Sequence, residues 1–160
     1  SLVVGEADAH LVGGVNLILT PEASTAMAAS GMLATSGRCY TFDTAAEGFA
    51  RAEACVCLVL EAQQSGPGGS AAIFYVLGSR VRSDGKSPSL TAPNGRAQQQ
   101  LIQLTLSDAG LASRDTALLE AHGTGTALGD PIEAGSIAGV MLKPEAAAAA
   151  GHALQIGSVK

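Results

Sequence analysis

The chain has 160 residues, of which 47% are hydrophobic, 20 are glycine and only 3% are aromatic, so it has the length of one ordinary domain, or a large piece of one, with an aliphatic core. Its formal net charge is −5, and it contains no Lys/Arg cluster, which argues against a nucleic-acid-binding surface. No apolar run approaches the roughly 18 residues of a membrane span and no signal segment opens the chain, so we expect a soluble, intracellular, cytoplasmic protein.

Strand-like and helix-like segments alternate along the chain. Apolar runs of strand length predict strands at residues 10–19, 54–61, 71–81, 117–121 and 153–159. Capping residues and apolar periodicity predict helices at residues 23–29, 95–109 and 131–142. Residues 30–50 are typical of a long ordered loop, and the Gly/Ser/Pro-rich residues 63–70 are the strongest candidate for an internal boundary. The alternation predicts parallel crossovers and hence a layered α/β fold.

The segment from Glu120 to Ala134 combines an ionisable side chain, a glycine-rich turn and a helix start. His122 is expected where the strand at 117–121 emerges into a loop. Asp130 fits the N-cap of the next helix, Pro131 its first position, and Glu133 the third, which gives a variant of the capping box. The unpaired N–H groups and the positive end of this helix would then lie near the histidine loop, where they suit developing negative charge.

Three interpretations of this segment are possible. The first is a capped βα turn in which the histidine only forms hydrogen bonds with its neighbours. The second is a dinucleotide-binding loop. The third is a catalytic loop in which the histidine donates a proton or stabilises an oxyanion. The glycine spacing, Gly123-x-Gly125-x-x-x-Gly129, differs from the usual dinucleotide fingerprint.

The run Glu120-Ala-His-Gly-Thr-Gly-Thr-Ala-Leu-Gly-Asp-Pro-Ile-Glu-Ala134 resembles the first-histidine motif of β-ketoacyl synthases, specifically the ketosynthase domains of type I polyketide synthases. Further segments match this family in the same order. They are Gly13-Gly-Val-Asn-Leu17, Gly37-Arg-Cys39 with Thr41-Phe-Asp43, Leu90-Thr-Ala-Pro-Asn-Gly95 with Ala97-Gln98, and Gly157-Ser-Val-Lys160. The resemblance covers nearly the whole chain.

The resemblance implies the thiolase-like fold, in which two pseudo-repeated halves enclose the active site. Residues 1–62 would end the first half, 63–70 would connect the halves, and 71–160 would begin the second. We therefore expect an internal piece of a ketosynthase domain, whose parent dimerises through a strand upstream of Ser1.

The resemblance also implies the chemistry of an acyltransferase. A malonyl-type extender unit would lose carbon dioxide and condense, in a Claisen reaction, with an acyl group bound to a cysteine. His122 would stabilise the enolate by donating a hydrogen bond, and Lys160 would help to hold the active-site histidines and their charge balance. Thr124 and Thr126 match positions that bind the phosphopantetheine arm of the acyl carrier protein, which is the expected partner. No directly bound cofactor and no metal are expected.

The nucleophilic cysteine and the second histidine of this family lie in segments that this sequence does not include, so we expect the isolated chain to be inactive. Two alternatives stay open: a decarboxylase-only domain and a non-catalytic ketosynthase-like domain. The second is suggested by Ala52 and Ala54, which replace family glycines; at positive φ each replacement would cost on the order of 1–2 kcal/mol.

The remaining cysteines and histidines match no catalytic motif. Cys55 and Cys57 lie two residues apart in an apolar strand and are expected in the core, while Cys39 is expected to be structural. An odd number of cysteines suits a reducing compartment. His10 and His152 are expected at the surface or at an element edge.

Overall fold

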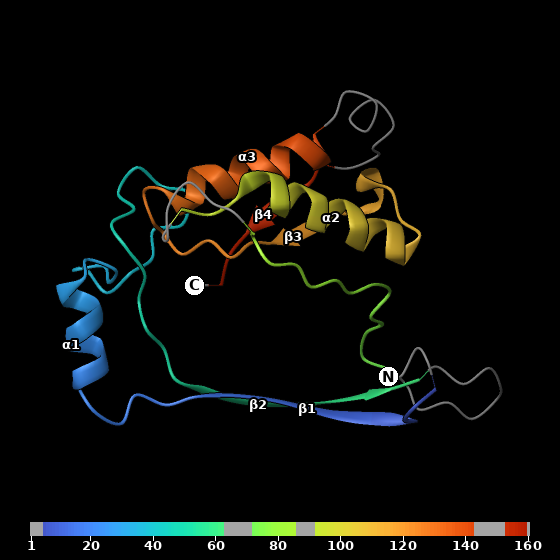
Figure 1. The fold of residues 1–160 in the computed structure, drawn as a ribbon, viewed down its shortest axis with the longest axis horizontal. Helices are drawn as coiled ribbons and strands as arrows, with labels where there is room; N and C mark the ends of the chain where they lie inside the picture. The colour runs from blue at the N-terminus through green and yellow to red at the C-terminus, as the bar shows by residue number, and fades with distance from the viewer. Residues whose placement is uncertain (1–4, 63–71, 86–91, 143–152, 160) are drawn as a thin grey trace. The chain divides into compact units, whose positions relative to one another are not determined.

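A computed structural model describes residues 5–62, 72–85, 92–142 and 153–159. These residues form two compact units (Figure 1). The first combines residues up to Ala23 with Arg51–Tyr75, and the second combines Ser24–Ala50 with the chain from Val76 onward. None of the helices in the described residues is both long and apolar enough to cross a membrane.

The first unit is a two-stranded sheet. Strand β1, Ala9–Asn16, pairs along its whole length with β2, Ala54–Glu61, and the pairing is antiparallel from Ala9 opposite Glu61 to Asn16 opposite Ala54. The expected parallel crossover is wrong here. The chain between these strands enters the second unit, and the order of elements alone does not set the strand direction.

Two expectations for this sheet need correction. Cys55 and Cys57 are exposed rather than buried, because the described residues of the first unit supply only these two strands and cover neither face. Positive φ occurs among the described non-glycine residues only at Tyr40 and Phe42, so Ala52 and Ala54 have ordinary backbone and the strain expected there is absent. His10, expected at the surface or at an element edge, is half-buried and lies in β1, which pairs with only one strand among the described residues.

The second unit packs two helices beside a parallel pair of strands. Helix α2, Gly95–Ala109, lies against α3, Gly129–Met141, and strands β3, Leu118–Glu120, and β4, Gln155–Gly157, pair in parallel as predicted (Figure 1). Helix α1, Glu22–Ala29, and the short 3₁₀ helix η1, Ser113–Asp115, complete the elements. Apart from η1, which the sequence patterns did not predict, each of these helices and strands lies within about three residues of its predicted range.

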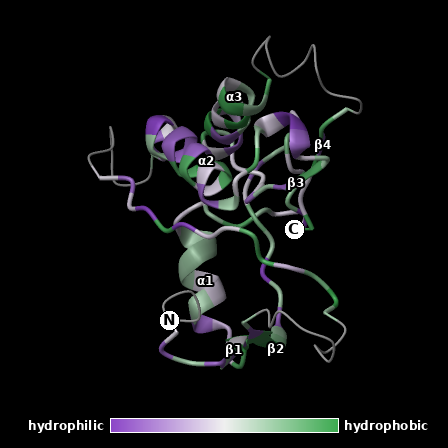
Figure 2. Ribbon diagram, turned by 90° about the vertical axis from the view of Figure 1, so that its right-hand side faces the viewer, coloured by the Kyte–Doolittle hydropathy of each residue, from purple (hydrophilic) through white to green (hydrophobic). Residues whose placement is uncertain are grey.

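The core of the second unit is the buried side of α3 together with β3. Ile137, Val140 and Met141 pack with Ala121, and partly buried residues of α2 and of the strands surround them. Both hydrophilic and hydrophobic residues occur along α2, as expected for a helix with one apolar face (Figure 2). The two helices approach closely at small residues: a Cβ at Gly95 would lie 3.1 Å from the Ser136 hydroxyl.

Helix α2 has both ends specified by local residues. The Asn94 side chain accepts hydrogen bonds from the N–H groups of Arg96 and Ala97, at 3.1 and 3.2 Å. Gly110 ends the helix with φ of 68°, and its N–H bonds back into the last turn. An Asn N-cap and a left-handed glycine are strong local signals, which is why this helix matches its prediction residue for residue.

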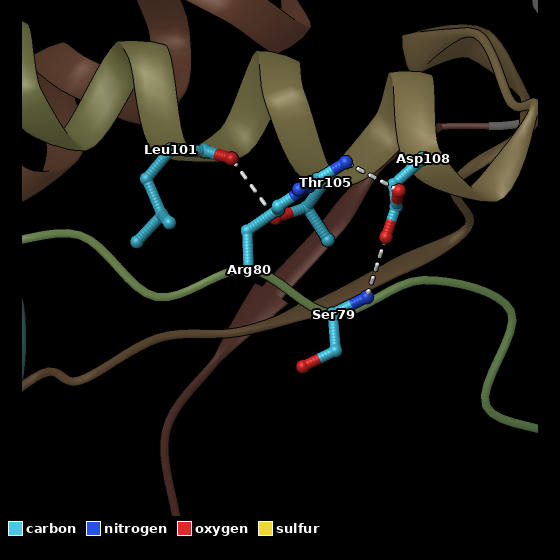
Figure 3. A network of polar contacts seen from close by, with 5 residues as sticks. All are labelled: Ser79, Arg80, Leu101, Thr105 and Asp108. Atoms are coloured by element: carbon cyan, nitrogen blue, oxygen red, sulfur yellow. Dashed lines mark hydrogen bonds and ion pairs between the residues drawn. The ribbon is translucent and has the colours of Figure 1, made fainter. Parts of the chain in front are cut away.

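The strand predicted at 71–81 is wrong for the residues that the structure describes. Residues 72–81 are irregular, and from Val76 they run beside α2 rather than beside a strand. Asp108 of α2 accepts hydrogen bonds from the Ser79 N–H at 3.3 Å and from the Arg80 guanidinium at 2.6 Å (Figure 3). An apolar run forms a strand only when a second strand supplies its ladder, and here the polar partners come from a helix.

Candidate functional site

His122 stands at the carboxyl end of β3, as predicted. The parallel pairing with β4 continues one residue past the strand, where the Ala121 N–H donates to the Gly157 carbonyl at 2.8 Å. Ala121 is buried, whereas His122 is exposed. The paired strands therefore lead from the buried core to His122, which is exposed at the start of a loop.

The backbone on both sides of His122 is held by one carboxylate. Glu133 of α3 accepts hydrogen bonds from the N–H of His122 at 2.7 Å and from the N–H of Gly123 at 2.9 Å, one with each oxygen. The capping-box role predicted for Glu133 is wrong, because its side chain reaches the strand end instead of the helix start. Two charge-assisted bonds to consecutive amides fix the peptide planes around His122.

Asp130 is not the N-cap of α3. The helix starts at Gly129, Leu128 caps it without a side-chain bond, and Asp130 lies inside the first turn. Its carboxylate is buried, with 4% relative exposure, and accepts three backbone hydrogen bonds: from Gly125 at 3.1 Å, Thr126 at 3.2 Å and Phe42 at 2.8 Å. Three N–H donors replace the water that this buried carboxylate loses.

The loop also uses N–H groups of the first helical turn that were expected to be unpaired. The Gly129 N–H donates to the Thr126 hydroxyl at 3.1 Å and the Asp130 N–H donates to the Thr126 carbonyl at 3.1 Å. Four loop amides, those of His122, Gly123, Gly125 and Thr126, are meanwhile bonded to carboxylates. A loop whose amides already bind two anionic side chains is poorly suited to a pyrophosphate, which argues against the dinucleotide interpretation.

The two predicted threonines lie next to one another in this loop. The hydroxyl oxygens of Thr124 and Thr126 are 3.4 Å apart, and both residues are half-buried. Because the Thr126 oxygen accepts from Gly129, its O–H remains available to donate. Since one hydroxyl of this pair donates to the other, the pair offers one further O–H donor on the loop that begins with His122.

The glycines of the loop permit close approach of a second segment. Gly125 has φ of 69° and is packed on Cys39, whose carbonyl oxygen would be 1.3 Å from any Cβ at this position. Gly123 has φ of 49°, and a Cβ there would lie 2.4 Å from the Thr41 methyl and 2.6 Å from the Ser158 Cβ. Side chains at these two positions are excluded by both backbone conformation and space.

The second segment, residues 37–50, forms a wall beside the histidine loop. The Thr41 hydroxyl donates to the Gly123 carbonyl at 2.6 Å, and the Gly48 N–H donates to the Gly125 carbonyl at 2.9 Å. An open hollow of about 530 Å³ is lined by Gly37, Arg38, Cys39, Tyr40, Thr41, Ala50 and Ser158. Cys39 is buried and its sulfur accepts from the Ala50 N–H at 3.3 Å, which fits the structural role expected for it.

No role was predicted for Gly37–Asp43 beyond its match to the family. Only that match could have marked Thr41, since nothing local links it to Gly123, 82 residues later. Lys160 and His152 lie outside the described residues. Within the described ranges, no cluster of three His, Cys, Asp or Glu side chains is arranged to hold a metal ion.

Comparisons with known protein families cover nearly all of the chain. A family profile described as "Beta-ketoacyl synthase, C-terminal domain" matches residues 73–160, and one described as "Beta-ketoacyl synthase, N-terminal domain" matches residues 1–65. The chain is 44% identical over 156 residues, 97% of its length, to a phenolphthiocerol/phthiocerol polyketide synthase of Mycobacterium tuberculosis. It is 40% identical, over 98% of its length, to the highly reducing polyketide synthase virA of Hypocrea virens.

Solved ketosynthase structures resemble the chain over 99% of its length at 33% identity. The oxazolomycin ketosynthase domain OzmH KS7 of Streptomyces albus JA3453 matches with a TM-score of 0.87, and the ketosynthase from module 6 of the bacillaene synthase of Bacillus subtilis 168 matches with 0.80. The fold is therefore the thiolase-like α/β fold of ketosynthases, as predicted. The chain spans 7% of the mycobacterial relative, 6% of the Hypocrea relative, and 27% and 28% of these two ketosynthase chains.

Proposed function

This chain belongs to the β-ketoacyl synthase family, and we propose that the protein carrying it is a polyketide ketosynthase, an acyltransferase that performs decarboxylative Claisen condensation. The single observation that supports this most is the exposed His122 at the end of β3, with its backbone held by Glu133 and with glycine beside it. The division into halves at residues 1–62 and 71–160, joined by 63–70, is part of the same proposal.

The reaction requires stabilisation of an enolate. The bond between the malonyl carboxylate and its α-carbon breaks, carbon dioxide leaves, and the electron pair passes to the α-carbon and the thioester oxygen. The α-carbon then attacks the carbonyl carbon of the acyl group on the nucleophilic cysteine, and the cysteine thiolate leaves. His122 donates a hydrogen bond to the thioester oxygen while its charge develops.

The geometry suits this role in two ways. The carboxylates of Asp130 and Glu133 are bound to backbone N–H groups, so their charge is compensated locally and does not oppose a developing oxyanion as an unpaired carboxylate would. The hydrogen bonds also fix the backbone from which the imidazole projects before the substrate arrives, which reduces the reorganisation needed in the transition state.

The remaining roles follow from the family. Thr124 and Thr126 bind the phosphopantetheine arm of an acyl carrier protein through their hydroxyl groups, and Lys160 supplies charge balance for the histidines. The nucleophilic cysteine and second histidine lie elsewhere in the protein, which works as a cytoplasmic homodimer. Ala52 and Ala54 no longer favour a non-catalytic domain, because both have ordinary backbone.

The test uses the complete protein and separates two partial reactions, decarboxylation of malonyl-carrier protein and acylation of the nucleophile by an acyl thioester. His122→Ala should reduce decarboxylation by about 100-fold or more, because an oxyanion donor is removed, while acylation is retained. His152→Gln, which changes a histidine outside every family motif, is the control. If His122→Ala decarboxylated malonyl-carrier protein at the same rate as the wild type, the role proposed for His122 would be refuted.

A further inference from the structure

The Thr41 side chain fits the Gly123 peptide in two ways at once. Its hydroxyl donates to the Gly123 carbonyl at 2.6 Å, and its methyl group occupies the space beside Gly123 that a Cβ would need. Thr41 is half-buried and Gly123 is buried, so water does not freely replace this bond. The contact joins the wall segment, residues 37–50, to the residue that follows the histidine.

The backbone on either side of Thr41 is in an unusual conformation. Tyr40 has φ of 44° and Phe42 has φ of 58°, and these are the only described non-glycine residues with positive φ. Such a backbone conformation persists only where surrounding contacts stabilise it, and it is found more often at functional sites. Here the contacts are the Thr41 bond to Gly123 and the Phe42 bond to Asp130.

The same segment lines the hollow beside the loop. Thr41 and Ser158 lie on this lining, and both would be close to a Cβ at Gly123. Ser158 also donates a long hydrogen bond, 3.5 Å, to the His122 carbonyl. Among the contacts between residues 37–50 and the histidine loop, the Thr41 bond is the one made to the residue directly after His122.

We propose that Thr41 is a positioning residue for His122, acting through the Gly123 carbonyl, and that its hydroxyl rather than its bulk performs this task. The inference rests on the proposed function, because it assigns Thr41 to the decarboxylation step that His122 assists. Thr41 does not touch the reacting atoms. It holds the loop and the wall in one arrangement, which matters when a transition state needs its donor already in place.

Two substitutions divide the side chain into its parts. Thr41→Val keeps the shape and removes the hydroxyl, whereas Thr41→Ser keeps the hydroxyl and removes the methyl group. In the complete protein, Thr41→Val should lower kcat for malonyl decarboxylation about tenfold, as expected for one lost hydrogen bond, with KM and nucleophile acylation changed less than about twofold. Thr41→Ser should restore decarboxylation to within about twofold of wild type.

Thr105→Val is the matched control. It removes the same group from a threonine whose hydroxyl bonds to the Leu101 carbonyl of its own helix, at 2.9 Å (Figure 3). Decarboxylation should stay unchanged in this variant. If Thr41→Val does not fold, Thr41→Ala compared with Thr41→Ser asks the same question, since both remove the methyl group and only one keeps the hydroxyl.

The outcomes separate this inference from the proposed function. If Thr41→Val and Thr41→Ser lose decarboxylation activity equally, only packing matters and the inference is overturned. The inference is also overturned if neither variant loses decarboxylation activity. A parallel fall in decarboxylation and acylation would indicate general damage and would also overturn it. Absence of decarboxylation in the wild-type protein would instead refute the proposed function.

Discussion

The carboxylate of Asp130 accepts a hydrogen bond from the Phe42 N–H at 2.8 Å, across 88 residues of sequence. The other oxygen of the same carboxylate accepts from Gly125 and Thr126 in the histidine loop. One buried side chain thus links the wall segment to the loop. Because the three donors belong to the backbone, the link depends on the Asp130 carboxylate rather than on a second polar side chain.

Replacing Asp130 with Asn should separate the two segments. One oxygen of the amide can still accept from the loop, but its NH₂ group then faces the Phe42 N–H, and a buried donor is left without an acceptor. Leaving such a group unsatisfied costs about 1–3 kcal/mol. Hydrogen exchange of the complete protein should show faster exchange in residues 38–46 and a smaller change in residues 122–130.

Asp115→Asn provides the matched control for this variant. Asp115 accepts a hydrogen bond from the Ala112 N–H at 2.8 Å at the start of η1, away from the loop. Its replacement should accelerate exchange only near residues 111–116. Unchanged exchange in residues 38–46 of Asp130→Asn would contradict the linking role of this carboxylate.

Glu133→Gln should affect catalysis more directly than any change in the wall segment. Glutamine can accept from only one of the N–H groups of His122 and Gly123, so the backbone next to the imidazole loses a bond on one side. The loss of a charge-assisted bond, about 1.5–3 kcal/mol, predicts a decarboxylation rate reduced by roughly 10- to 100-fold. Steady-state decarboxylation of malonyl-carrier protein measures this, and a rate within about twofold of wild type would show that Glu133 does not position His122.

Gly125→Ala should prevent the loop from adopting its present conformation. The new Cβ would lie 1.3 Å from the Cys39 carbonyl oxygen at a φ of 69°, so backbone must move on both sides. Gly135→Ala, in α3, meets no atom within 4 Å and should be neutral or stabilising by about 0.5–1 kcal/mol. The Tm of Gly125→Ala should therefore be lower than that of the wild type, whereas the Tm of Gly135→Ala should be unchanged or higher.

Local signals predicted α2 well, because Asn94 and Gly110 bond within a few residues of themselves. The same reasoning failed for α3. Asp130 and Glu133 have the residue types of a capping box, but longer-range donors, Phe42 and the amides at the end of β3, compete for their carboxylates. A cap can be inferred from spacing only when no tertiary partner is available, and spacing does not reveal such a partner.

The strands show the same limit. Apolar runs located β1, β2, β3 and β4, but they did not set the antiparallel direction of the first pair, and they wrongly predicted a strand for the described residues 72–81. Strand pairing depends on residues far away in the sequence, whereas hydrophobic periodicity is local. The position of His122 was predictable because the strand before it and the glycine after it are both local features.

Glu47 makes the wall segment sensitive to acid. The N–H of Ser36, at 3.0 Å, and the Thr35 hydroxyl, at 2.9 Å, donate to its carboxylate and lower the pKa of Glu47 below its ordinary value. Because the pKa is lowered in the folded state, these contacts stabilise the turn at residues 34–37 fully when the pH is above the ordinary glutamate pKa. The stabilisation is lost as the pH falls through the lowered pKa. Glu47→Gln has no charge to lose, so it should be less protected than wild type at pH 6, and this difference should shrink as the pH falls below the ordinary glutamate pKa. Hydrogen exchange of residues 34–37, taken as the ratio of wild type to Glu47→Gln at each pH and referred to residues 97–107 of α2, measures this difference. A ratio that stays constant from pH 6 to about 3 would show that the Glu47 charge does not hold the turn.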